Sequence, residues 1–308
     1  MPESPEEFDS AVRLAAFAFL EECLSKGPDE TVTSEVLRDG FTFRGLPVPL
    51  WAPQGIFKPK VLPEMPLTIR TTPPKPDRPI PYDDAVTSDG TLLYAFRAGN
   101  HPDNARLEKA MVRKAPLIYL RGIVPGRYLP FFPVYVTAMD PLKRTFAVPL
   151  DDAVQSLGPD WVDARRSAQP RRRYITVPVK KRMHQASFRE RVLRAYRECC
   201  AICRLRHREL LDATHILPDA DPRGEPAVSN GLSLCKLHHA AYDAHILGIR
   251  PDLRIDVRID ILKEIDGPML LHGLQGFQGQ RLLSPRHLED RPNRDYLAEQ
   301  YERFQRAS

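Results

Sequence analysis

The chain has 308 residues, of which 42% are hydrophobic and 28% charged, and its net charge is +5. This is the composition of a globular protein, and because domains commonly run about 100–200 residues, the length predicts two of them. No apolar run of about 18 residues occurs, and the acidic amino end, MPESPEEFDS, lacks the basic and apolar regions of a secretion signal. We therefore expect a cytoplasmic protein without a membrane span, in which clustered cysteines indicate metal or redox chemistry before disulfides.

The first residues predict helices. Ser4 and Glu7 have the spacing of a capping box that opens an amphipathic helix through about Leu24. A second short helical segment, SEVLRDG, ends at Gly40.

Short β-strands are predicted between residues 41 and 150. The chain has 31 prolines, and Pro, Gly and Asp separate the β-rich stretches FTFRGLPVPLW, PLTIRTT, GTLLYAFRAG, APLIYLRGIV, FPVYVTAMD and RTFAVPL. One helical segment, NARLEKAMVRK, interrupts them. The pattern predicts a small curved sheet or barrel with recognition loops.

A Pro- and Arg-rich connection follows. It carries a basic run with no acid between its members: Arg165, Arg166, Arg171, Arg172, Arg173, Lys180, Lys181 and Arg182. Such a run binds a polyanion such as DNA or is simply a solvated linker, and charge alone does not decide between the two.

The last part of the chain begins with a predicted helix, SFRERVLRAYRE, which leads into a cysteine cluster. The apolar spacing of Leu234, Leu237, Ala241 and Ile246 indicates another helix. LRIDVRIDIL alternates like a strand, and NRDYLAEQYERFQRA predicts a closing helix.

Two short motifs suggest a metal site. Cys200 and Cys203 form a C-x-x-C pair, and Cys235 and His238 form a C-x-x-H pair. Together they offer the four thiolate and imidazole ligands of a closed structural zinc site, which leaves Cys199 as a spare thiol. The alternative for the first pair is a redox dithiol or a chance cluster.

A second histidine follows the zinc knuckle directly. Neighbouring residues on a helix point about 100° apart, so His239 faces away from a zinc ion that His238 binds. With His215 and Asn230 upstream, the chain presents His, Asn and His in order.

The string CCAIC…LLDATHILP…VSNGLSLCKLHHAAYDAHILGI resembles the HNH, or ββα-metal, nuclease family, in the branch whose finger is held by zinc knuckles. The similarity covers about residues 185–250. Many relatives read C-x-x-C-H at the second knuckle, whereas here His238 replaces the second cysteine and His239 is the last family histidine.

The resemblance implies hydrolysis of phosphodiester bonds. His215 would be the general base, His239 would bind one catalytic divalent cation, and Asn230 would orient the base-bearing loop or help the metal. Some relatives have an acidic metal ligand where this chain has Thr214, so the second protein ligand stays open, with Asp212 as a candidate. Mg²⁺ or Mn²⁺ would serve as the catalytic cation, and an imidazole ligand also accepts Co²⁺ or Ni²⁺.

The stretch PYDDAVTSDGTLLYAFRAGN resembles the pocket segment of the SRA domain, a reader of modified cytosine. The matching positions are Tyr82, Asp83, Asp84, Asp89, Gly90, Tyr94 and Gly99. The resemblance implies that Tyr82 and Tyr94 stack on a flipped base while Asp84 accepts a hydrogen bond from its Watson–Crick edge. Another reader of the PUA-like class, or simple packing tyrosines and a turn, are the alternatives.

Together these features predict an α+β protein with an SRA/PUA-like curved β-barrel and a zinc-stabilised ββα-metal HNH domain. The expected parts are a helical segment at 1–40, the reader at 41–155, a basic linker at 156–184 and the nuclease at 185–308. The predicted function is a modification-dependent restriction endonuclease, a homodimer that reads 5-methylcytosine or 5-hydroxymethylcytosine in double-stranded DNA. Arg171, Arg172, Arg173, Lys180 and Lys181 would contact the DNA backbone. The alternatives are an HNH nuclease for unmodified DNA and a non-catalytic zinc-containing DNA-binding protein.

Overall fold

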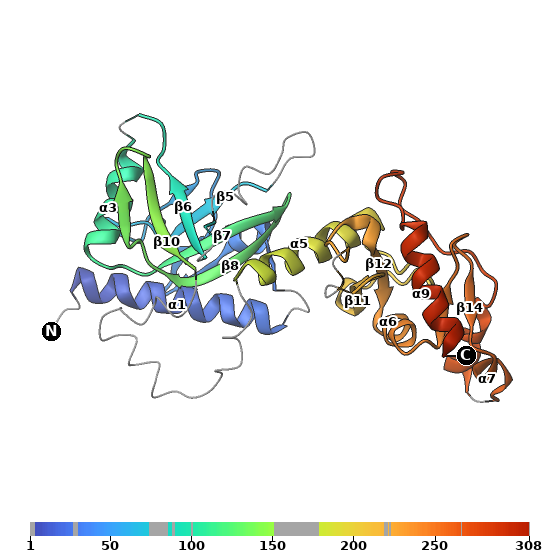
Figure 1. Ribbon diagram of the computed structural model, residues 1–308. Helices are drawn as coiled ribbons and strands as arrows, with labels where there is room; N and C mark the ends of the chain where they lie inside the picture. Colours follow the sequence, from blue (N-terminus) through green and yellow to red (C-terminus); the bar gives the residue numbers. More distant parts are fainter. Residues whose placement is uncertain are drawn as a thin grey trace. The chain divides into compact units, whose positions relative to one another are not determined.

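The computed structural model describes residues 4–26, 30–73, 86–87, 90–99, 101–150, 179–218, 221, 223–265 and 267–307, with the backbone alone at 179–184. The chain divides into two compact units, Met1–Ala186 and Ser187–Ser308, each with hydrophobic cores of its own (Figure 1). Within these ranges, no helix has the length and apolar character needed to cross a membrane.

The first unit combines helices with short strands. Its helices in the described ranges are α1 (Pro5–Lys26), α2 (Ser34–Asp39) and α3 (Pro102–Val112). Its strands are β1 (Val32–Thr33), β2 (Phe41–Phe43), β3 (Leu46–Val48), β4 (Ile56–Phe57), β5 (Thr68–Thr71), β6 (Thr91–Ala95), β7 (Leu117–Val124), β8 (Arg127–Val134), β9 (Ala138–Asp140) and β10 (Thr145–Pro149). The predicted capping box of α1 is confirmed, since Ser4 N donates to Glu7 Oε2 at 2.7 Å and Glu7 N donates to Ser4 Oγ at 3.2 Å.

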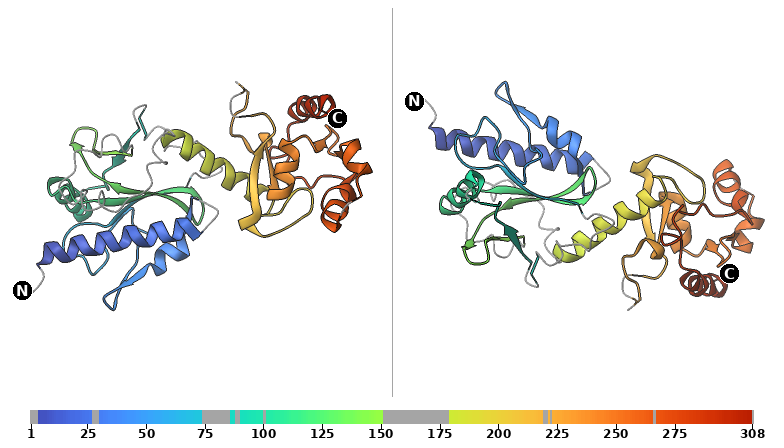
Figure 2. Two further views of the ribbon diagram at one scale, coloured as in Figure 1. Left: turned by 90° about the horizontal axis from the view of Figure 1, so that it is seen from below. Right: turned by 90° about the horizontal axis from the view of Figure 1, so that it is seen from above.

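The main sheet of this unit has two covered faces. Its order is β1-β8-β7-β5-β4, with β5 and β7 parallel and the other neighbours antiparallel. Alternate residues of β7 face two cores, because Ile118 and Leu120 pack with α1 whereas Leu117 and Tyr119 pack with β6, β10 and α3. Figures 1 and 2 show α1 on one side of this sheet and β6, β10 and α3 on the other.

The expected barrel differs from the observed arrangement. In the described part of the first unit, β6-β10-β9 form a second antiparallel sheet and β2-β3 a hairpin, both separate from the main sheet, and these strands do not close into a barrel. Several of the strands span only two or three residues, and sequence patterns alone do not report how such short strands pair.

The second unit has short strands among helices. Its helices in the described ranges are α5 (Val179–Ala195, which starts in the first unit), α6 (Lys236–Asp243), α7 (Ile259–Lys263), α8 (Pro268–Gly273) and α9 (Arg294–Arg306), with 3-10 turns at Arg208–Leu210, Val228–Asn230 and Gln275–Phe277. Its strands are β11 (Leu211–His215), β12 (Gly231–Cys235), β13 (Leu247–Ile249) and β14 (Ile255–Val257). They pair as two antiparallel hairpins, β11-β12 and β13-β14, around one core.

Two predicted elements of the second unit were wrong in part. Leu234 lies on β12 and not on a helix, because a short apolar run fits the periodicity of either element and only Leu237 and Ala241 belong to α6. The alternating pattern after Leu253 predicts one strand, but β14 ends at Val257 and α7 begins at Ile259.

Candidate functional site

A β-hairpin and the helix that follows it assemble the predicted site residues. In the β11-β12 pair, His215 lies opposite Gly231 and Asp212 lies opposite Leu234. Helix α6 begins at the residue after β12, so its first turns return along the hairpin. This strand–strand–helix order places His215 at the end of β11, Asn230 just before β12 and His239 on α6.

The four predicted zinc ligands lie together. The ligand atoms of Cys200, Cys203, Cys235 and His238 are all within 4.8 Å of one another. His238 Nδ1 is 3.1 Å from Cys235 Sγ and 3.5 Å from Cys200 Sγ, and the sulfurs of Cys203 and Cys235 are 3.9 Å apart. Three thiols and one imidazole, largely buried, are a donor set that fits a structural zinc ion.

The orientation of His238 is fixed by its other ring nitrogen. Nε2 lies 2.8 Å from the carbonyl oxygen of Gly273, which can only accept, so Nε2 carries the proton and Nδ1 is left for the sulfurs. The ring also meets Phe277 edge-on, with centroids 5.2 Å apart. Backbone carbonyls commonly orient metal-binding histidines in this way. The cluster is thereby tied to α8, a link that the sequence did not signal.

Hydrogen bonds within the cluster shift the pKa values of two of its thiols in opposite directions. Hydrogen bonds from Cys200 and Cys203 hold the pKa of the Cys235 thiol well below its usual range, whereas hydrogen bonding with Cys200 and Cys235 raises the pKa of Cys203. Cys199 is not part of the cluster, because its thiol points to the carbonyl of Cys200 at 3.7 Å. The interpretation of Cys199 as a spare thiol agrees with this geometry.

A carboxylate meets the second histidine of α6. Asp212 Oδ2 is 3.2 Å from His239 Nδ1, and Asp243 Oδ2 is 3.2 Å from His239 Nε2. Lys236 Nζ lies 2.7 Å from both carboxylate oxygens of Asp212. The hydrogen bond from His239, with help from Lys236, lowers the pKa of Asp212 to about 2, and the bond to Asp212 raises the pKa of His239. Asp212 is therefore ionised and paired with both His239 and Lys236.

His215 and Asn230 are held in different ways. The ring of His215 stacks on Phe188, with centroids 3.9 Å apart and planes 16° apart. Asn230 is 1% exposed, and its Oδ1 accepts from Leu217 N at 2.9 Å while its Nδ2 donates to the carbonyls of Leu217 at 3.1 Å and Glu225 at 3.2 Å. The amide therefore fastens the loop that follows His215, which favours loop orientation over metal binding for Asn230.

Residues 200–250 match the HNH endonuclease family. The chain carries an HNH endonuclease domain. Among solved structures, the chain is similar to the modification-dependent TagI restriction endonuclease, with a TM-score of 0.30 and 15% sequence identity over 78% of this chain and 82% of that chain. No curated protein matches the chain.

Replacing Asn230 tests how much its amide stabilises the loop that follows His215. We expect Asn230→Ala to lower the free energy of unfolding by about 1–3 kcal/mol, because the buried backbone N–H and carbonyl of Leu217 and the part-buried carbonyl of Glu225 lose their partner. Urea denaturation measures the change. Gln278→Ala is the matched control, since that amide also accepts from a backbone N–H, at Val257, and lies outside the matched region. Equal stability of Asn230→Ala and the unaltered chain would contradict the assignment.

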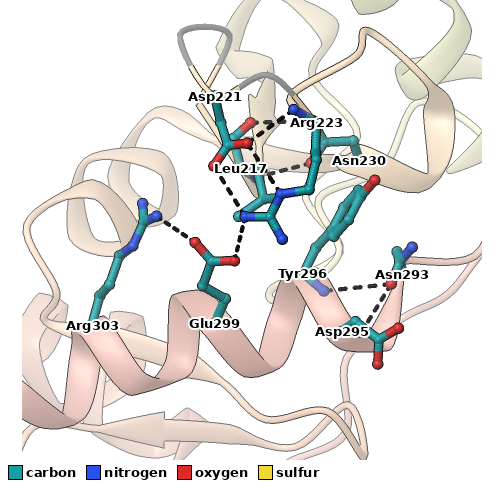
Figure 3. A network of polar contacts seen from close by, with 9 residues as sticks. All are labelled: Leu217, Asp221, Arg223, Asn230, Asn293, Asp295, Tyr296, Glu299 and Arg303. Carbon is teal, nitrogen blue, oxygen red and sulfur yellow. Dashed lines mark hydrogen bonds and ion pairs between the residues drawn. The ribbon is translucent and has the colours of Figure 1, made fainter.

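The C-terminal helix also holds this loop of the HNH domain. Arg223 pairs with Asp221 at 3.2 Å and with Glu299 of α9 at 2.7 Å, and Glu299 also pairs with Arg303 at 2.7 Å (Figure 3). Asn293 N donates to the carbonyl of Ser229 at 2.9 Å, directly before Asn230. This contact was not predictable from the sequence, because charged residues on a helix surface are usually solvated and their distant partners leave no pattern.

The predicted residues of the first unit are only partly described. Tyr94 is 7% exposed, belongs to the core between the sheets and donates its hydroxyl to the carbonyl of Arg70 at 3.2 Å. This differs from the expected base-stacking position, since a stacking ring has to expose a face. Tyr82, Asp83, Asp84 and Arg171–Arg173 lie outside the described residues, as do the side chains of Lys180 and Lys181.

Proposed function

We propose that the chain hydrolyses phosphodiester bonds in double-stranded DNA through its HNH domain, with His215 as the general base. The observation that carries this proposal is the joint placement of His215, Asn230 and the Asp212–His239 pair on one hairpin and helix. His215 would take the proton of the attacking water, since a neutral imidazole accepts a proton near cellular pH. Asn230 would keep the loop after His215 in place through its backbone contacts.

Asp212 and His239 are the residues that would hold the catalytic cation, Mg²⁺ or Mn²⁺, with Co²⁺ or Ni²⁺ as substitutes. A carboxylate oxygen and an imidazole nitrogen suit such a cation, and they lie 3.2 Å apart here. When bound, the cation would stabilise charge on the scissile phosphate and on the departing oxygen. Asp243 would orient the imidazole by accepting from its other nitrogen.

Lys236 contacts both carboxylate oxygens of Asp212, which would also bind the cation, so its removal should tighten cation binding. A divalent ion and an ammonium group on the same carboxylate repel each other, and Lys236 is half-exposed and can move away. Because exposed ion pairs contribute roughly 0.2–1 kcal/mol, we expect Lys236→Ala to lower the Kd for Mn²⁺ by at most about fivefold. Electron paramagnetic resonance of free Mn²⁺ measures this, and Lys263→Ala is the control. Weaker binding in Lys236→Ala would contradict the placement of the cation at Asp212.

We propose further that the first unit restricts this activity to DNA with modified cytosine. The support is the resemblance of residues 81–100 to the SRA pocket segment, in which Tyr82 and Asp84 would receive the base. The basic run at Arg171–Arg173, Lys180 and Lys181 would contact phosphates, which add affinity without sequence preference.

Plasmids with and without cytosine methylation test both proposals. The full chain with Mg²⁺ or Mn²⁺ should cut the methylated plasmid, and His215→Ala should bind it without cutting. Equal cutting of both plasmids would indicate an HNH nuclease for unmodified DNA, and binding without cutting would indicate a non-catalytic DNA-binding protein.

Binding of short duplexes with one cytosine, 5-methylcytosine or 5-hydroxymethylcytosine identifies the base that is read, and Tyr82→Ala should abolish the preference.

We propose that the chain acts as a homodimer. One HNH site cuts one strand, so a double-strand break takes two copies of the site or two successive visits. Sedimentation of the chain on a methylated duplex should give the mass of two protomers. A monomer that accumulates nicked plasmid would contradict this proposal.

A further inference from the structure

An aromatic ring lies flat against the proposed general base. Phe188 on α5 is 2% exposed, and its ring is 3.9 Å from the ring of His215, with planes 16° apart. Both residues belong to the second unit. Two flat rings at this distance restrict each other's tilt, so Phe188 determines the plane of the imidazole.

A glycine makes room for this ring. Gly231 is the residue opposite His215 in the hairpin. A Cβ at Gly231 would lie 3.0 Å from Phe188 Cζ and 2.4 Å from Val192 Cγ2. A Cβ contact of 2.4 Å essentially never occurs, and one of 3.0 Å is tighter than nine in ten real contacts, so any larger residue at Gly231 would force the side chains of Val192 and Phe188 to shift.

The helix that carries the ring is fixed to the same strand at three successive turns. Val192 and Tyr196 follow Phe188 at helical spacing and are both almost fully buried. The hydroxyl of Tyr196 donates to the carbonyl of Gly231 at 3.3 Å. The ring of Phe188 is therefore carried by a rigid helix, and close packing keeps its side chain from changing rotamer.

We propose that Phe188 is a positioning residue of the nuclease. Its ring occupies the space that Gly231 leaves open and sets the plane of the His215 imidazole. This inference rests on the proposed role of His215. A fixed ring plane keeps the proton-accepting nitrogen aimed at the water, and misplacement of a reacting group by about 1 Å can cost 100-fold in rate. The aromatic face also stabilises the positive charge that the imidazole gains with the proton.

Phe188→Leu and Gly231→Ala test the proposal from its two sides. Leucine at Phe188 keeps an apolar side chain of similar size but removes the flat face. Alanine at Gly231 displaces the ring while both Phe188 and His215 keep their own side chains. We expect both variants to lower kcat by about 10- to 100-fold with KM nearly unchanged. Tyrosine at Phe188 is no rescue, because its hydroxyl would enter the space beside Gly231.

A direct readout without substrate comes from NMR of the full chain with labelled histidine. The His215 C–H signals, assigned by their loss in His215→Ala, carry the ring-current shift of Phe188. They should move in both variants towards the positions of unstacked histidines.

Two matched variants control for general loss of packing. Leu193→Ala removes a fully buried side chain from the same helix and core without removing an aromatic ring. Gly267→Ala adds a Cβ where no atom lies within 4 Å. Zinc content and circular dichroism identify any variant that fails to fold, in which case the other variant of the pair decides.

The proposal is overturned if folded Phe188→Leu or Gly231→Ala keeps kcat, or if kcat falls no further than in Leu193→Ala while the His215 signals stay in place. If His215→Ala itself still cuts DNA, the proposed function fails, even if the NMR signals show the stacking. If His215→Ala is inactive while Phe188→Leu and Gly231→Ala are fully active, only the positioning role of Phe188 fails.

Discussion

Replacing His215 by alanine is expected to lower kcat for DNA cleavage by about 10²- to 10⁴-fold, the usual contribution of a positioned general base. The residue ends β11, its ring is fixed by stacking, and the loop behind it is fastened by Asn230. The variant removes the proposed proton acceptor and its stacking contact with Phe188, and it leaves the Cys200–Cys203–Cys235–His238 cluster and the Asp212–His239 pair intact. Single-turnover cleavage of a methylated duplex measures the effect.

The control for this prediction is His287→Ala, which removes an exposed imidazole from the same unit. It should cleave at the rate of the unaltered chain. Binding of the duplex should be equal in all three proteins, because His215 acts on water and not on the DNA backbone. Cleavage by His215→Ala at more than about one-tenth of the original rate would refute its assignment as the base.

The cluster of three cysteines and His238 was predictable because its signal is local. A C-x-x-C or C-x-x-H spacing brings two ligands to one turn whatever the rest of the chain does, and the structure adds only that the two turns meet. The capping box at Ser4 and Glu7 was predictable for the same reason.

The contacts of Asp212 and Phe188 were not predictable from local patterns. Strand alternation places Asp212 on the face opposite to His215, but nothing in the sequence says that α6 covers that face and brings His239 to it. Phe188 lies on α5 and His215 at the end of β11, far apart in the sequence. From the sequence alone, Phe188 is only one apolar position of a predicted helix. Such contacts depend on which faces pack together, which a single sequence does not report.

The burial of Tyr94 could be predicted from the local strand pattern. Its burial follows from the alternation of β6, in which Leu92 and Tyr94 face the core. The resemblance to a base pocket assigns the same tyrosine a stacking role, for which its buried ring would have to become exposed.

Loss of the metal is expected to unfold the second unit and leave the first unit folded. The cluster joins the turn after α5, the end of β12 and the start of α6, and His238 extends it to α8 through Gly273. Structural zinc sites in small peptides provide about 10–16 kcal/mol of apparent binding energy, which is as large as the roughly 5–15 kcal/mol by which a domain is usually stable. The first unit has separate cores around β7 and contains none of the four ligands.

Cys200→Ser and Cys199→Ser distinguish a metal site from a buried thiol cluster, because the two residues are adjacent and both buried, yet only Cys200 contacts the other ligands. Cys200→Ser should lose the bound zinc and the hydrogen-exchange protection of β11, β12 and α6, while β7 and β8 stay protected. Cys199→Ser should retain one zinc ion per chain and its cleavage activity. Zinc retained by Cys200→Ser, or lost from Cys199→Ser, would show that the ligand set is wrong, and the hairpin that positions His215 would then need another source of stability.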